Sequence, residues 1–173
     1  MQTETLVGLI SGLGGAVIGS MGALGGAWLQ QRSQAKNSKR ERDEQRALSS
    51  GEVALNELLR LNQLTDAVVR GTAEENWKEQ AAELVRHAEI AIRVIPNSFD
   101  LRETMAHYFF AMQHYHFVGN SGALATMTLR TASAEGFNAL AAFLRGDELP
   151  KHSETFLAME RRIQVAYMRD LAS

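Results

Sequence analysis

The chain has 173 residues and a formal net charge of −2, with no cysteine and only two prolines. Its length allows one compact domain with an appendage, and its balanced composition argues against general disorder. The lack of cysteine excludes disulfide frameworks, thiolate metal sites and thiol catalysis. The slightly negative charge gives no overall argument for nucleic-acid binding.

The N-terminal run from Thr5 to Leu29 contains no ionisable side chain. As a helix its 25 residues would extend about 37 Å, which exceeds the roughly 30 Å hydrocarbon core of a bilayer. The run therefore predicts a single transmembrane helix within residues 1–30. A cleaved signal peptide is the weaker interpretation, because such peptides carry their basic region before a shorter apolar stretch.

Glycines within this run follow a regular rhythm, with spacings that alternate between four and three residues. On a helix they share one face, while bulky residues such as Leu13 and Val17 lie near the opposite side. This pattern resembles that of glycine-zipper membrane segments, in which small residues allow close backbone approach in lipid. Because the chain offers one such span, we expect a homo-oligomer built on this face. The face comprises Gly8, Gly12, Gly15, Gly19, Gly22 and Gly26.

The same apolar run permits other interpretations. It could be buried in a soluble or particle-forming assembly, or it could insert into a membrane only on activation, as in phage penetration proteins and defence-type pore formers. A ring of such helices could also enclose a pore or channel. Against a pore, the run offers little polar lining beyond Ser11 and Ser20.

A basic stretch follows the apolar run and predicts a juxtamembrane helix over residues 31–50. The positive-inside bias places the C-terminal domain in the cytoplasm and the N-terminus outside, at a bacterial inner membrane. Ser49 and Glu52 are spaced as a capping box, which predicts an interruption of the helix there. The residues expected at the lipid headgroups, in preference to nucleic acid, are Trp28, Arg32, Lys36, Lys39 and Arg40.

The rest of the chain, residues 51–173, predicts an all-α bundle of four to five helices, because no segment alternates with a period of two. Gly71 ends the first helix, and Thr72 with Glu75 forms a capping box for the second. Ser153 caps the last helix. The helices expected before it span residues 52–70, 73–95, 99–118 and 123–145.

The strongest candidate for chemistry in this bundle is a set of three residues on one predicted helix face, Glu103, His107 and His114. Carboxylate and imidazole groups can bind a metal, but helical di-metal bundles need a Glu-x-x-His pair on each of two helices. No such pair, phosphate-binding loop or nucleophile elbow occurs in the sequence. We therefore expect no enzyme, metal or cofactor. The prediction is a membrane-anchored protein whose helical domain clusters and meets other copies or a partner protein.

Overall fold

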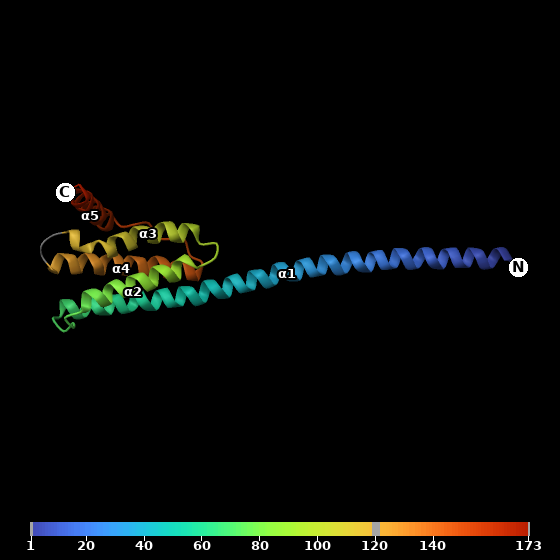
Figure 1. The fold of residues 1–173 in the computed structure, drawn as a ribbon, viewed down its shortest axis with the longest axis horizontal. Helices are drawn as coiled ribbons and strands as arrows, with labels where there is room; N and C mark the ends of the chain where they lie inside the picture. The colour runs from blue at the N-terminus through green and yellow to red at the C-terminus, as the bar shows by residue number, and fades with distance from the viewer. Residues whose placement is uncertain (1, 119–121, 173) are drawn as a thin grey trace. The chain divides into compact units, whose positions relative to one another are not determined.

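Over the residues that it describes, the computed structural model contains five α-helices and one 3₁₀ helix, which confirms the all-α part of the predicted fold class (Figure 1). It describes the backbone of residues 2–118 and 122–172, and the side chains of residues 34, 36–118 and 122–172. No strand occurs in these ranges. The elements are α1 (Gln2–Val69), α2 (Trp77–Arg93), α3 (Phe99–Gln113), η1 (Tyr115–Val118), α4 (Gly122–Arg145) and α5 (Glu154–Leu171).

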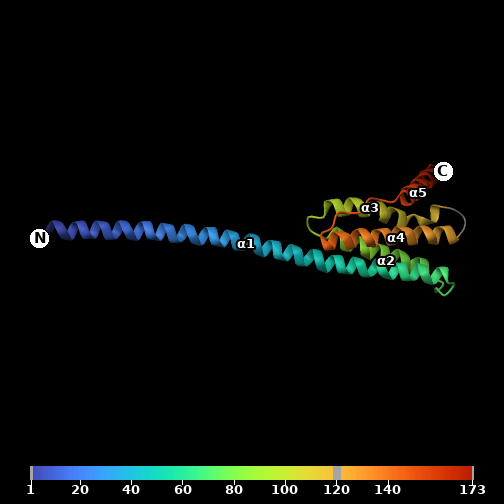
Figure 2. The same ribbon diagram turned by 180° about the vertical axis from the view of Figure 1, so that it is seen from behind.

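Two compact units divide the chain, one from Met1 to Asp43 and one from Glu44 to Ser173. The second unit, called the helical domain below, holds the C-terminal part of α1 and all later helices. Within it, α3 and α4 lie side by side in both views, as do α2 and the C-terminal part of α1 (Figure 1, Figure 2). Every candidate site with described side-chain contacts lies in this domain.

The predicted interruption at Ser49–Glu52 is wrong, because α1 continues through these residues without a break. A packing contact explains the difference. Gly51 is buried, and a Cβ atom placed on it would clash with the side chain of Leu144 on α4. The glycine therefore allows α4 to approach α1, and its local tendency to end a helix is overridden.

The prediction that Gly71 ends the first helix is confirmed, but the prediction that Thr72 and Glu75 cap the second helix is wrong. Gly71 has a φ of 72°, a left-handed conformation that favours glycine after a helix end. The hydroxyl of Thr72 donates to the carbonyl of Ala67 at 3.3 Å, so this side chain serves the end of α1 and not the start of α2. As a result α2 begins at Trp77, four residues later than predicted.

The end of α3 and the start of α5 can also be compared with the helix boundaries predicted from the sequence. The predicted helix over residues 99–118 stops at Gln113, and Tyr115–Val118 form the 3₁₀ helix η1. The capping prediction for Ser153 is confirmed, because its hydroxyl accepts a hydrogen bond from the backbone N–H of Phe156 at 3.0 Å. Ser153 therefore fixes where α5 begins.

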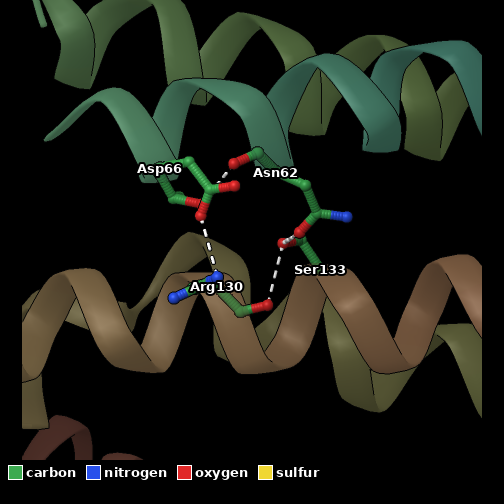
Figure 3. A network of polar contacts seen from close by, with 5 residues as sticks. Asn62, Asp66, Arg130 and Ser133 are labelled. Atoms are coloured by element: carbon green, nitrogen blue, oxygen red, sulfur yellow. Dashed lines mark hydrogen bonds and ion pairs between the residues drawn. The ribbon is translucent and has the colours of Figure 1, made fainter. Parts of the chain in front are cut away.

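A polar network joins α1 to α4 at the edge of the core (Figure 3). The hydroxyl of the buried Ser133 donates to the side-chain oxygen of Asn62 at 2.5 Å. One turn away, Arg130 and Asp66 form an ion pair at 2.9 Å. These directional contacts set the register of the two helices, while buried apolar side chains supply most of the packing energy.

Candidate functional site

Polar side chains from three helices and one loop meet at the junction of α3, α4 and α5. We call them the His–Glu cluster and define it as His107, Tyr108, Glu135, His152 and Glu160. The α3 helix carries the first two, α4 carries Glu135, the loop before α5 carries His152, and α5 carries Glu160. The buried residues of the domain are mostly apolar, and Glu160 is the one Asp, Glu, Lys, Arg or His residue buried among those that the structure describes.

The central contact joins His107 to Glu160. Nδ1 of His107 lies 2.7 Å from Oε1 of Glu160. Glu160 is 5% exposed, whereas the side chain of His107 is 46% exposed. A buried carboxylate therefore holds a solvent-accessible imidazole in a fixed orientation, as in pairs where a carboxylate positions a histidine.

A second carboxylate, Glu135, lies on the other side of Tyr108. It accepts hydrogen bonds from the hydroxyl of Tyr108 at 3.5 Å and from the hydroxyl of Ser153. Burial, together with the negative charge of Glu135, raises the pKa of Tyr108 well above its usual range. Tyr108 therefore stays protonated and acts as a hydrogen-bond donor, which makes it unsuited to serve as a base.

The ring of His152 contacts other aromatic rings in and beside the cluster. Its ring stacks on Phe156 at 5.3 Å and meets the edge of Tyr108 at 4.9 Å, and its centroid lies 5.0 Å from that of His107. Nδ1 of His152 is buried, with no hydrogen-bond partner among the described residues. Burial first, and the nearby His107 second, lower the pKa of His152, although Glu160 and Glu135 oppose the change.

These shifts predict that the helical domain loses stability in mild acid. Burial also lowers the pKa of His114, with His116 adding to the effect. A histidine whose pKa is lowered in the folded state binds fewer protons than in the unfolded chain, so stability falls as the pH drops below about 6.5. We expect a lower Tm at pH 5.5 than at pH 7.5, and a smaller difference in His152→Gln. The test uses thermal melts at both pH values, with the exposed His87→Gln as the control. An identical pH dependence in all three proteins would contradict the assignment to His152.

The candidate metal residues do not form a metal site in the described structure. Glu103 is exposed, His107 contacts Glu160, and the ring of His114 packs on Tyr167 at 4.5 Å. Over the described residues, no group of three or more His, Asp or Glu side chains is placed to hold a metal ion. In the described structure, His107 and Glu160 form one hydrogen-bonded pair of this cluster, and Tyr108 and Glu135 form another.

The membrane predictions fall mostly on side chains that the structure leaves out. The backbone of residues 5–29 is helical and belongs to α1, but the six glycines, Trp28 and Arg32 lie outside the residues with described side chains. Lys36, Lys39 and Arg40 are described, and all three are exposed. Among the described residues, no helix combines the length and the apolar character needed to cross a membrane.

Sequence reasoning found His107 but missed Glu160, Glu135 and His152. A signal for Glu160 was present, because it lies between Phe156 and Ile163 on the apolar stripe that α5 buries. A carboxylate at such a position requires a partner from another helix. The chain matches no family model, no curated protein and no solved structure. The functional argument therefore rests on the sequence and the structure of this chain itself.

Proposed function

We propose that this chain is a single-pass membrane-anchored protein that self-associates through the glycine face of residues 5–29 and clusters its helical domain near the membrane. One observation carries the proposal: the uncharged run with its glycine rhythm is followed at once by a basic segment. Glycines at this density would each cost an aqueous helix roughly 1 kcal/mol relative to alanine, so they suit a helix that packs in lipid.

The exposed basic side chains that follow the apolar run support a membrane surface at this part of α1. Lys36 and Lys39 lie on α1 with their side chains in solvent. Basic residues that flank an apolar helix contribute about 1 kcal/mol each when they contact anionic headgroups. The positive-inside bias of such residues also favours a helical domain on the cytoplasmic side.

The glycine face makes the proposal testable by substitution. We expect Gly15→Leu with Gly19→Leu to weaken self-association by about tenfold or more, since added side chains hold the helix backbones apart. The matched control is Leu13→Ile with Val17→Leu on the bulky face, which should leave association unchanged. Association is measured by analytical ultracentrifugation in mild detergent, after carbonate extraction has shown that the protein stays in the membrane fraction.

Three results would count against this function. Release of the full chain by carbonate would remove the anchor, and equal effects of the two double variants would remove the glycine face. Dye leakage from liposomes that carry the inserted protein would favour a pore in place of a clustered interaction domain.

A further inference from the structure

A pocket opens between α4 and α5, next to η1 and apart from the His–Glu cluster. Its volume is about 430 Å³, within the range of about 300–1,000 Å³ that is usual for small-molecule sites. Leu124 and Met127 form the wall from α4, and Ala158 and Met159 form the wall from α5. The site is therefore an apolar cleft between two helices of one domain.

The apolar wall is only partly covered by the protein. Met127 is 51% exposed and Leu124 is 43% exposed, although both line this cleft. Large apolar side chains that share one concave surface mark binding sites more often than isolated exposed ones do. An apolar ligand would remove this surface from water at a gain of roughly 25 cal/mol per Å².

One charged side chain lines the pocket, the guanidinium of Arg162. This side chain is exposed to solvent, and it makes no hydrogen bond or ion pair with any residue that the structure describes. Thr131 and Thr155 bring hydroxyl groups to the same lining. An unpaired guanidinium beside an apolar cleft is complementary to a ligand with an apolar body and an anionic head, and its planar fork suits a carboxylate.

We propose that this pocket binds a single-chain carboxylate amphiphile of about ten carbons, such as a medium-chain fatty acid. The alkyl chain would lie between Met127 and Met159, and the carboxylate would pair with Arg162. A cleft of about 430 Å³ is large enough to admit a ligand of this size. The proposal does not depend on membrane anchoring, because all its residues lie in the helical domain.

The test is photo-crosslinking with a ten-carbon fatty acid that carries a diazirine near the end of its chain. The full-length protein is used, in lipid nanodiscs or in buffer if it proves soluble, and labelled residues are located by mass spectrometry. We expect labelling at the pocket-lining segments of α4 and α5 that is competed by excess decanoate and not by decanol. Arg162→Gln should reduce competed labelling by about tenfold or more.

Two further variants make the result specific. Arg161→Gln changes the adjacent exposed charge, which does not line the pocket, and should label like the wild type. Met127→Glu places a negative charge in the cleft and should abolish competed labelling, while circular dichroism confirms that each variant is folded. Labelling spread evenly over the domain, equal competition by decanol, or full labelling of Arg162→Gln would each overturn the proposal.

Discussion

Replacing Phe156 by alanine is expected to lower the free energy of unfolding of the helical domain by about 3–5 kcal/mol. Phe156 is completely buried at the start of α5, and its ring lies 4.7 Å from Tyr108 and 5.3 Å from His152. Truncation would leave a cavity where α5 meets α3 and would remove two ring contacts at once. Because Ser153 caps the same helix, α5 would keep its local start signal and lose its main anchor in the core.

The measurement is urea unfolding of the purified full-length protein, followed by far-UV circular dichroism. Phe99→Ala serves as the control, because Phe99 is 70% exposed and should change stability by no more than about 0.5 kcal/mol. Similar midpoints for the two variants would show that α5 does not depend on Phe156 for its attachment to the domain.

The helix boundaries that the sequence predicted correctly are those determined by local chemistry. Gly71 ends α1 because the left-handed backbone there favours glycine, and Ser153 begins α5 because its hydroxyl accepts an N–H of the first turn. The failed prediction of an interruption at Ser49–Glu52 depends on a contact with a distant residue. Gly51 was interpreted as part of an interruption, but its lack of a side chain instead makes room for Leu144.

The same distinction applies to the candidate site. The spacing of His107 on its helix indicated a functional face, but its partner Glu160 lies 53 residues later, on a helix whose packing angle no local pattern encodes. Similarly, Glu135 and Ser153 meet only because α4 and the start of α5 pack together. Sequence patterns could therefore identify the helices and some of the polar residues, while their pairing depends on tertiary packing.

Replacing His107 and replacing Glu160 should lower the free energy of unfolding of the helical domain by different amounts. Among the described residues, His107 supplies the one hydrogen bond recorded for the buried carboxylate of Glu160. We expect His107→Leu to cost about 1–3 kcal/mol, since a buried acceptor would be left without its partner. Glu160→Leu should cost less, because the half-exposed imidazole of His107 can be solvated by water.

A double-mutant cycle distinguishes this pairing from simple loss of packing. The double variant His107→Leu with Glu160→Leu should be more stable than His107→Leu alone, because it removes the orphaned carboxylate together with its partner. Chemical denaturation at pH 7.5 provides all four free energies of unfolding. Additive costs, or a smaller cost for His107→Leu than for Glu160→Leu, would mean that water satisfies Glu160 and that the pair does not hold α5 to α3. A non-additive result would instead establish that the carboxylate on α5 depends on the imidazole on α3, so that the exposed histidine is held in place from the interior of the domain.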